Sequence, residues 1–478
     1  MQHAHDDSSA STLEKTDGHL SGHGAAANGH STLNPITSQT DANDLPETAE
    51  TPEGLAAEGD VEQAREKAPM NPMMDPSSFP DGGLKAWSVV LGGFCCLFVS
   101  FGWINCIGVF QDYYQTHQLR DYSPSTVAWI PALQTFMMFL GGPFIGKIYD
   151  NYGPRWILLF GSFMHVFGLM MTSLSTEYYQ FILSQGICSP IGASCIFYTA
   201  LGCTPTWFFR RRAFAFGIVA SGSSLGGVIF PIMVQRLVNN VGFPWTMRAS
   251  AFLILGLLVI ANLTVRSRIP PVKKPVSVLE FLVPFTELPF SLVTAAGFLF
   301  FFGLFVPFTF IILQGISVGM SADLAGYLVP ILNAASLFGR IIPGWIADKI
   351  GRFNVMIMTT YFSAIITLAL WRNAHTSAAV IVFAALFGFS SGAYVSLAPA
   401  TIAQISDVRQ IGVRTGSLFA AISLAALFGS PVAGALNTRE NGGFNELQIF
   451  AGVMMMGGAT LFVLARVRLA GVKVMVKV

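Results

Sequence analysis

The segment Asn333–Arg352, NAASLFGRIIPGWIADKIGR, carries one arginine inside an apolar run and ends in a polar turn. The apolar residues around it, 326–347, are numerous enough to cross a bilayer, which takes about 20 residues. Because an arginine near the centre of such a helix costs roughly 2.5–3.5 kcal/mol on insertion scales, Arg340 must face protein or water. Asn333 and Ser336 precede it by seven and four residues, so they share its helix face. The pattern predicts a helix with a narrow polar stripe that lines a cavity.

Two roles of Arg340 are compatible with this pattern. It either binds an anionic group of a solute in the cavity, or it bonds helix-end carbonyls or reaches towards a membrane interface. Its five N–H donors are difficult to satisfy without an anion, a carboxylate or several carbonyls, and the apolar spans contain no Asp or Glu. The other polar residues within the spans serve either as helix contacts or as solute contacts: Asn105, Gln134, His165, Gln185, Ser221, Ser223, Ser224, Tyr394 and Ser396.

The composition is that of a protein with many membrane spans. Of its 478 residues, 53% are hydrophobic and 11% are charged, whereas soluble domains carry about 25% charged residues. The net charge of +1 says nothing about nucleic acid, but the chain has no clustered basic face outside short loops, and no nucleic-acid partner is predicted. The six cysteines lie in or beside apolar runs without zinc-ligand spacing, so neither a metal nor a cofactor is predicted. The spans hold no carboxylate pair and no nucleophile set, and the chain has no phosphate-binding loop of the form GxxxxGK followed by Ser or Thr, so an enzyme and an ATP-driven pump are both disfavoured.

Twelve apolar runs of bilayer-spanning length follow Lys85, and strands are excluded because unpaired strand edges cannot face lipid. The predicted spans are 86–110, 125–148, 156–174, 179–201, 213–236, 245–265, 290–312, 324–347, 354–371, 378–399, 412–435 and 447–466. Lys and Arg are in excess in the loops on one side, which predicts that this side is cytosolic and that both termini lie there. These loops contain Arg155, Arg210–Arg212, Arg266–Lys274, Lys349–Arg352 and Arg409.

The composition along the chain predicts a division into two halves. Residues 1–79 are polar and poor in apolar side chains, which is typical of a disordered tail. The proline-rich, basic loop 266–289 is the longest internal loop and separates six spans from six. The predicted segments are a disordered cytosolic tail (1–79), an N-terminal six-helix bundle (80–265), a cytosolic inter-bundle loop (266–289), a C-terminal six-helix bundle (290–467) and a cytosolic C-terminal tail (468–478).

A repeated pattern supports this division. GKIYDNYGPR follows the second span and GWIADKIGR follows the eighth, with Gly, Asp and Gly at the same spacing in both. Glycine allows close helix approach, and an aspartate at a helix end either pairs with a nearby arginine or accepts bonds from the N-terminus of a neighbouring helix. The pattern predicts either a latch between the halves that opens and closes, or a static loop staple. Its residues are Gly146, Asp150, Gly153 and Arg155 in the first copy and Gly344, Asp348, Gly351 and Arg352 in the second.

These two copies resemble the pattern that the major facilitator superfamily carries between its second and third helices. The resemblance covers about residues 80–470 and implies an all-α membrane protein with twelve transmembrane helices in two six-helix bundles. It also implies secondary transport of a small-molecule organic solute across the lipid bilayer by alternating access, with a proton as a candidate co-transported ion. We expect a monomer.

Two further segments resemble the monocarboxylate-porter family within that superfamily. Residues 80–87, PDGGLKAW, resemble its Asp-Gly-Gly entrance motif, and residues 207–212, WFFRRR, resemble its fifth-helix motif. The run 100–110, SFGWINCIGVF, resembles the fungal branch, which includes nutrient porters and exporters linked to secondary metabolism. The residues that match the two motifs are Asp81, Gly82, Gly83, Trp87, Phe208, Arg210, Arg211, Arg212 and Gly217.

The resemblance implies a role for Arg340 and contains two departures. These porters place at this position the arginine that holds a carboxylate. Asn105, however, stands where the family has its first-helix lysine, and Ser336 stands where it has an aspartate. Proton-coupled lactate transport therefore does not carry over, and we expect a solute that is larger or less simply anionic than lactate.

We expect a secondary transporter that exports a small organic, acidic solute, such as a secondary metabolite, across the plasma membrane. The carboxylate or enolate of the solute would bind Arg340, and aromatic side chains of the seventh helix, such as Phe305, would cover its apolar body. The expected solute contacts are Arg340, Ser336, Asn333, Asn105, Tyr394 and Phe305. The alternatives are uptake of a monocarboxylate or vitamin, a vacuolar or peroxisomal location, and a non-transporting membrane sensor.

Overall fold

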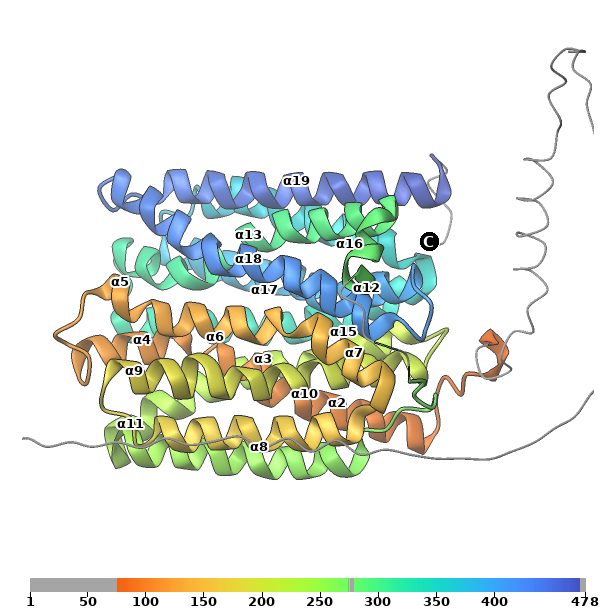
Figure 1. The fold of residues 1–478 in the computed structure, drawn as a ribbon. Helices are drawn as coiled ribbons and strands as arrows, with labels where there is room; N and C mark the ends of the chain where they lie inside the picture. Colours follow the sequence, from red (N-terminus) through yellow and green to blue (C-terminus); the bar gives the residue numbers. More distant parts are fainter. Residues whose placement is uncertain (1–74, 274, 276–278, 473–478) are drawn as a thin grey trace, which may run out of the picture. The chain divides into compact units, whose positions relative to one another are not determined.

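The computed structural model describes residues 75–273, 275 and 279–472, which form helices joined by loops (Figure 1). The helices up to the inter-bundle loop are α2 (Leu84–Val99), α3 (Phe101–Ile104), α4 (Ile107–Thr116), α5 (Pro124–Val127), α6 (Trp129–Leu140), α7 (Gly142–Tyr152), α8 (Pro154–Thr172), α9 (Tyr178–Phe181), the π-helix η3 (Ile182–Cys188), α10 (Ser189–Cys203) and α11 (Arg212–Thr264). The helices that follow are α12 (Leu279–Leu282), α13 (Leu288–Ser317), α14 (Ala322–Gly326), α15 (Leu328–Ile350), α16 (Arg352–Ile366), the π-helix η6 (Thr367–Trp371), α17 (Ser377–Gln404), α18 (Ile411–Arg439) and α19 (Asn445–Ala470).

The fold class predicted from the sequence is confirmed, and the helices account for twelve spans. In the described residues, ten helical stretches are long and apolar enough to cross a membrane. One of them, α11, comprises two spans, because Gly242 at φ 77° and ψ 165° interrupts its 53 residues. The pair α6 and α7, which meet at Gly141, supplies the remaining span. The order of the spans agrees with the predicted one.

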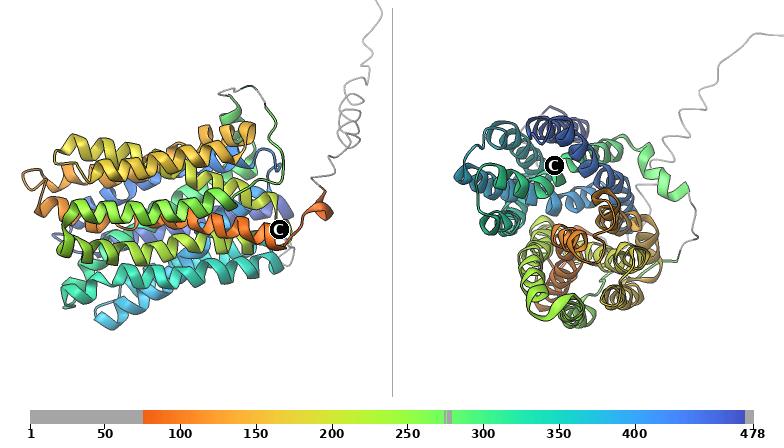
Figure 2. Two further views of the ribbon diagram at one scale, coloured as in Figure 1. Left: turned by 90° about the horizontal axis from the view of Figure 1, so that it is seen from below. Right: turned by 90° about the vertical axis from the view of Figure 1, so that its left-hand side faces the viewer.

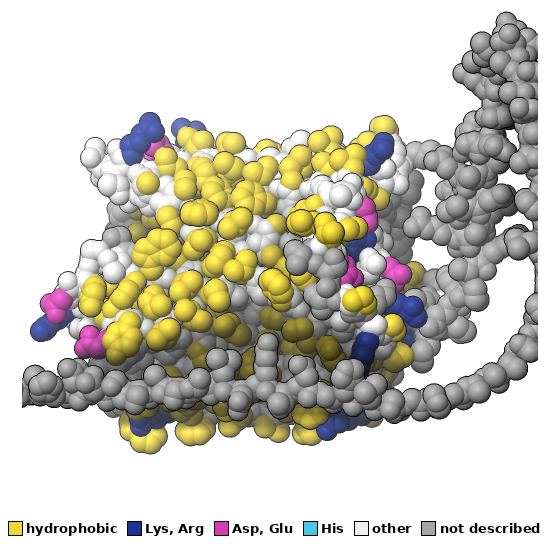
Figure 3. All heavy atoms as spheres, viewed as in Figure 1, with side chains coloured by type: hydrophobic (Ala, Val, Ile, Leu, Met, Phe, Trp, Pro, Cys, Tyr) yellow, Lys and Arg dark blue, Asp and Glu magenta, His cyan; other side chains and the backbone are white. Residues whose placement is uncertain are grey.

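The flank of the bundle is apolar and its ends are charged. In Figure 3, hydrophobic side chains cover the visible flank, and Lys, Arg, Asp and Glu side chains gather at the two ends. Large apolar side chains such as Trp156, Phe163 and Trp245 are exposed, which lipid tolerates and water does not. The surface is therefore that of a helical protein that crosses a bilayer.

The helices form two bundles that meet along a central interface, as the end-on view in Figure 2 shows. Several helix pairs cross this interface; among them, α7 packs against α18, and the first part of α11 packs against α15. Small residues allow both contacts. A Cβ atom on Gly146 would lie 2.3 Å from the carbonyl oxygen of Gly412, and one on Gly217 would lie 2.4 Å from that of Arg340. The backbone of Arg340 therefore lies at a closest approach of the two bundles.

Both copies of the repeated pattern lie at one end of the bundle, the right-hand end in Figure 1, where α7 and α15 finish. We call this the repeat end and the opposite one the far end. Gly153 at φ 77° and Gly351 at φ 106° end these two helices in the left-handed region that favours glycine. The second glycine of each copy is thus required for the turn into the next helix.

The structure bears on the predicted segments at three places. The tail predicted for 1–79 falls mainly on residues outside the described ones, but Phe79 is buried because its ring packs on Phe209, with centroids 5.6 Å apart. The predicted loop 266–289 contains the short helix α12. Helix α19 extends into the predicted tail 468–478, because the left-handed residue that stops it is Gly471 at φ 67°, and residues 473–478 lie outside the described ones.

Candidate functional site

The side chain of Arg340 lies between the two bundles and is 4% exposed. Its Nη1 donates to the backbone carbonyl of Ala220 at 2.6 Å and to the hydroxyl of Ser223, both on α11. Its Nε donates to Ser336 Oγ at 3.2 Å. The described residues thus provide two hydroxyls and one carbonyl for the guanidinium, and none of these partners carries a negative charge. In the alternative role, backbone carbonyls would satisfy Arg340. Only one of its three bonds, the one to the carbonyl of Ala220, is of that kind.

Arg340 occupies a position that the first half of the chain fills with glycine. It precedes Gly344 by four residues, as Gly142 precedes Gly146 in the first copy of the repeat. Gly142 also lies at the bundle interface, since a Cβ atom there would be 2.6 Å from the carbonyl oxygen of Gly416. Close packing at this position therefore needs only glycine, so the guanidinium in the second copy indicates a role beyond packing.

The two asparagines predicted as solute contacts bond each other across the interface. Asn333 Nδ2 donates to Asn105 Oδ1 at 3.1 Å, which joins α15 to the first span. Gly227 on α11 lies against this pair, because a Cβ atom there would be 2.7 Å from Asn333. The structure thus brings four predicted contacts, Arg340, Ser336, Asn333 and Asn105, to the interface of the bundles.

Tyr394 and Phe305, the other two predicted contacts, make interactions within the second bundle. The hydroxyl of Tyr394 donates to the carbonyl of Gly297 at 3.5 Å, and its ring centroid lies 4.6 Å from that of Phe300. Phe305 is half-buried, with its ring centroid 5.0 Å from that of Phe301. Tyr394 therefore ties α17 to α13, whereas Phe305 keeps a partly accessible ring.

The partners of Arg340 on α11 were not singled out from the sequence. Ser223 was one polar residue among several, although small residues recur every three or four positions at Gly217, Ala220, Ser224 and Gly227. Such a stripe indicates close contact with another helix. It does not identify that helix, which here is α15.

The aspartates of the repeated pattern cap helices of the opposite bundle. Asp348 accepts from the backbone N–H groups of Ala213 at 3.0 Å and Phe214 at 2.8 Å, at the N-terminus of α11. Asp150 accepts from the backbone N–H of Val413 at 3.2 Å, near the N-terminus of α18. Because the first N–H groups of a helix lack intrahelical partners and carry partial positive charge, each carboxylate ties one bundle to the other. The repeat end is therefore joined in this structure.

The arginines of the two copies differ in their contacts. Arg352 donates to Asp348 at 3.4 Å and to the carbonyl of Phe209 at 3.0 Å. Arg155 is exposed. It follows Gly153 by two positions, whereas Arg352 follows Gly351 directly, and each residue turns a helix by about 100°. The extra residue thus places Arg155 on a different helix face.

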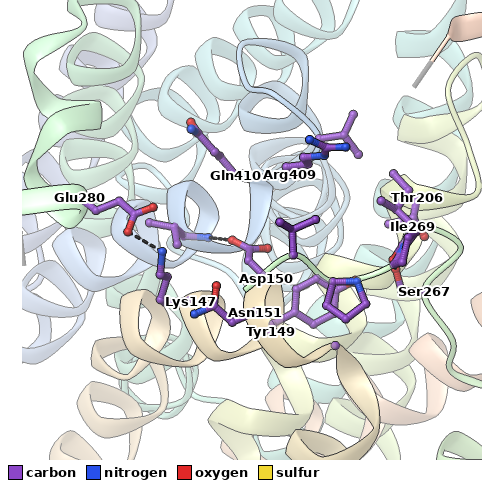
Figure 4. A pocket seen from close by; sticks show the side chains of 16 residues that line it. Lys147, Tyr149, Asp150, Asn151, Thr206, Ser267, Ile269, Glu280, Arg409 and Gln410 are labelled. Carbon is purple, nitrogen blue, oxygen red and sulfur yellow. Dashed lines mark hydrogen bonds and ion pairs between the residues drawn. The ribbon is translucent and has the colours of Figure 1, made fainter. Parts of the chain in front are cut away.

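The inter-bundle loop lies against the same end of the molecule. Lys147 donates to Glu280 of α12 at 2.5 Å, and the backbone N–H of Val272 donates to the carbonyl of Asp150 at 3.3 Å. A cavity of about 50 Å³ lies at this place, and Lys147, Asp150 and Glu280 are among the residues that line it (Figure 4). The loop is therefore attached to the first bundle beside the contact of Asp150 with α18.

Reversing one charge of the Lys147–Glu280 pair is expected to lower the thermal midpoint of the purified protein by a few degrees. Lys147→Glu places a carboxylate opposite Glu280 at a position that is 3% exposed. The doubly reversed variant, Lys147→Glu with Glu280→Lys, is expected to recover most of the loss, with a coupling energy of about 1 kcal/mol. Thermal unfolding of the unaltered protein, both single variants and the double variant measures this coupling. Losses that simply add would show that the pair does not attach the loop.

The segments 80–87 and 207–212 contact each other. Asp81 Oδ1 accepts from three consecutive backbone N–H groups at 2.7, 2.8 and 3.2 Å, those of Phe209, Arg210 and Arg211. The ring of Trp87 lies 5.1 Å from that of Phe208, and Gly83 at φ 83° precedes α2. Residues far apart in the sequence thus form one structural unit, in which Asp81 caps the turn before α11.

The three arginines of this unit have different surroundings. Arg210 and Arg211 are exposed, whereas Arg212 is buried. The Nη1 of Arg212 donates to the carbonyl of Ala403 on α17 at 3.0 Å, and its Nε donates to that of Phe208 at 3.0 Å. Arg212 therefore adds a further contact between the two bundles at the repeat end.

Replacing Asp81 with alanine is expected to lower the free energy of unfolding by about 1–2 kcal/mol, because three N–H groups lose their acceptor. Asp81→Asn keeps a side-chain oxygen and is expected to retain most of the stability. Thermal unfolding of the purified variants measures the difference. Asp121→Ala, at an exposed side chain, is the control. An Asp81→Ala protein as stable as the unaltered one would contradict the capping role.

A second polar cluster lies inside the first bundle. The hydroxyl of Tyr114 donates to Gln185 Oε1, and Gln185 Nε2 donates to Gln134 Oε1 at 3.2 Å. The ring nitrogens of His165 lie 2.9 Å from Ser189 Oγ and 3.1 Å from a backbone carbonyl of the first span. These side chains satisfy one another within one bundle, as helix contacts do.

Comparison with known proteins identifies relatives over most of the chain. The family model described as "Major Facilitator Superfamily" matches residues 91–372 and 293–474. The chain is 57% identical over 422 residues to "MFS-type transporter 1" of Ophiocordyceps sp., which covers 88% of this chain and 94% of the relative. It is 48% identical over 388 residues to the "Fujikurins efflux protein" of Gibberella fujikuroi, with 81% and 83% covered. The crystal structure of the E. coli fucose:proton symporter FucP superposes with a TM-score of 0.63 at 14% identity, covering 79% of this chain and 98% of that one.

Proposed function

Because this chain belongs to the Major Facilitator Superfamily, we propose that it exports a small organic, acidic secondary metabolite from the cytosol by alternating access between its two bundles. The observation that carries this proposal is the environment of Arg340. This cation is 4% exposed at the interface of the bundles, and its protein partners are two hydroxyls and one carbonyl. A carboxylate or enolate of the solute supplies the negative charge that these partners lack.

In the proposed site, the polar residues at the interface divide the recognition of the solute. Arg340 binds its acidic oxygen, and Ser336 is held ready by the bond from Arg340 Nε. The amides of Asn105 and Asn333 bond further oxygens after their mutual bond opens. Phe305 contacts the apolar part, and Tyr394 positions α13 through its contact with the carbonyl of Gly297.

The repeated aspartates form the latch of the proposed cycle. Asp150 and Asp348 each bind N–H groups of the opposite bundle, so both contacts must break when the bundles separate at the repeat end. The solute then enters from that side. Re-formation of the two caps closes the repeat end behind the solute, which leaves at the far end.

Export is the direction that the relatives' names support. One relative, 48% identical over 388 residues, is named an efflux protein for fujikurins. We also place the chain in the fungal branch of the monocarboxylate porters. The contact of Asp81 with residues 209–211 supports this placement, because it joins the two motifs on which the resemblance depends.

Location, topology and coupling belong to the same proposal. We place the protein in the plasma membrane, and the excess of Lys and Arg in the loops of the repeat end supports an orientation with both termini cytosolic. Residues 80–265 and 290–467 act as the two bundles of a monomer, joined by the loop 266–289. The coupling ion, if it is a proton, does not share a carboxylate with Arg340, because the described residues place no Asp or Glu among its partners.

Metabolite profiling of a strain that lacks this chain tests the proposal. The exported acid is expected to decrease severalfold in the medium and to accumulate in the cells, and the intact chain is expected to restore export. Accumulation in the medium would instead indicate uptake and would overturn the direction. An unchanged distribution of every metabolite would contradict transport.

A further inference from the structure

We infer that the acid carried by this protein is planar and conjugated, and that Phe139 and Phe419 receive its flat face beside Arg340. The inference rests on the proposed function, because it names the chemical class of the solute for the same site. It is carried by ring contacts that span the bundle interface.

A cluster of aromatic rings joins the two bundles. Phe139 of α6 stacks on Phe419 of α18, with centroids 5.5 Å apart and planes 12° apart. Phe139 also lies edge-on to Phe301 of α13 at 5.7 Å, and Phe419 lies edge-on to Phe197 of α10 at 5.3 Å. Each of these pairs has one ring in each bundle. We call these four residues, together with Phe101, the ring cluster.

Phe101 connects the ring cluster to the guanidinium. Its centroid lies 5.8 Å from that of Phe139 and 6.3 Å from that of Phe197. The Cζ atom of Arg340 lies 5.9 Å from the same ring centroid. An oxygen bound to Arg340 is therefore separated from the apolar faces of the ring cluster by about the width of one aromatic ring. A solute that uses both must carry its acidic group next to its flat part.

The position of the ring cluster distinguishes it from the core of a single bundle. Its rings are 1–6% exposed in this structure. Alternating access, however, requires α6 and α10 to move relative to α13 and α18, so these contacts cannot persist through the cycle. Opening at the repeat end exposes their faces to water, which is unfavourable in proportion to the apolar area. A flat solute covers the exposed faces and so stabilises the open state from which it is loaded.

The near-parallel rings of Phe139 and Phe419 favour a planar solute over a puckered one. Because the planes of Phe139 and Phe419 differ by 12°, separating them by the thickness of one ring creates a slot with two aromatic walls. A conjugated group contacts both walls over its whole face, whereas a puckered aliphatic ring does not. Stacking of this kind contributes up to about tenfold in affinity beyond area burial.

Binding of two matched acids to the full-length protein in detergent tests the inference. 2-Naphthoic acid and decahydro-2-naphthoic acid share one carbon skeleton and one negative charge at neutral pH, but only the first is planar. The saturated acid is the more apolar, so simple partitioning favours it. We expect isothermal titration calorimetry to show about tenfold tighter binding of naphthoate to the unaltered protein, and we expect Arg340→Gln to remove binding of both acids.

The double variant Phe139→Leu with Phe419→Leu keeps apolar bulk and removes both aromatic walls. It is expected to abolish the preference for naphthoate while changing the affinity for the saturated acid by less than about threefold. Phe98→Leu with Phe230→Leu is the matched control. These rings are also buried, with centroids 5.1 Å apart, but both lie in the first bundle, so the preference is expected to persist.

Three results would overturn the inference: equal affinities for the two acids in the unaltered protein, no binding of naphthoate, or a preference that survives in the Phe139/Phe419 double variant. The proposed function fails in a different way, namely when Arg340 variants leave both binding and flux of acids unchanged. Equal binding of both acids through Arg340 would reject the planar class and preserve the proposed function.

Discussion

Replacing Arg340 with alanine is expected to reduce solute flux by about 100-fold or more while leaving the amount of protein in the membrane unchanged. Removing one partner of a buried, hydrogen-bonded charge pair costs about 2–5 kcal/mol, and each 1.4 kcal/mol corresponds to a factor of ten in binding. Arg340→Lys is expected to fail as well, because an ammonium group keeps the charge but lacks the planar fork that reaches Ser223, Ser336 and a solute oxygen together.

The measurements must distinguish a solute-binding role of Arg340 from a purely structural role in joining the two bundles. Flux in vesicles, solute affinity and the thermal midpoint are measured on the same preparations. A merely structural Arg340 lowers the midpoint and leaves the affinity unchanged, whereas a solute-binding Arg340 lowers the affinity in every variant. Arg372→Ala, at an exposed side chain, controls for the general loss of an arginine. Undiminished flux in Arg340→Ala would defeat the proposed function.

Replacing Gly146 with valine is expected to reduce transport tenfold or more by preventing closure at the repeat end. A Cβ atom at this position would lie 2.3 Å from the carbonyl oxygen of Gly412 and 2.9 Å from the nitrogen of Val413, which is the group that Asp150 binds. Inserting side-chain atoms into such a contact costs about 1–3 kcal/mol, which is enough to shift the balance between closed and open states by one to two orders of magnitude.

The reactivity of the variant Thr415→Cys reports whether the repeat end is open or closed. Thr415 on α18 is 2% exposed, so Thr415→Cys is expected to react slowly with a charged maleimide in the unaltered background and faster together with Gly146→Val. Gly256→Val is the matched control, because a Cβ atom on this helical glycine has no neighbour within 4 Å. Normal transport by Gly146→Val at normal abundance would show that this contact is not part of a moving latch.

The membrane spans and the charged position inside one of them could be predicted because they depend on local composition. Because an unpaired charge in a bilayer is costly, Arg340 can be identified as a candidate functional residue from its local sequence alone. Its partner Ser223 could not be assigned, because the two residues are 117 positions apart and the choice of helix depends on packing. The same holds for Phe139 and Phe419, which look like ordinary core residues until both bundles are in place.

The repeated Gly-Asp-Gly pattern was likewise predictable only in part. Its spacing predicted aspartates at helix ends and left open whether an arginine or a helix N-terminus would bind them. In the structure, Asp348 has both partners, whereas Asp150 binds the N–H of Val413 and Arg155 is exposed. The sequence shows that Arg155 stands one residue further from its glycine than Arg352 does, but which arginine then reaches its aspartate depends on the packing of the helices.

By itself, the sequence determined that this is a helical membrane protein with two related halves and a single arginine that the bilayer would not accept without partners. These properties follow from hydropathy, charge and spacing, which act over a few turns of helix. Only the tertiary structure decided that Arg340 joins the two bundles, that each aspartate caps a helix of the opposite bundle, and that a cluster of five rings beside Arg340 spans the interface. Such contacts join residues more than a hundred positions apart, and close packing at glycines, rather than any local preference, selects them.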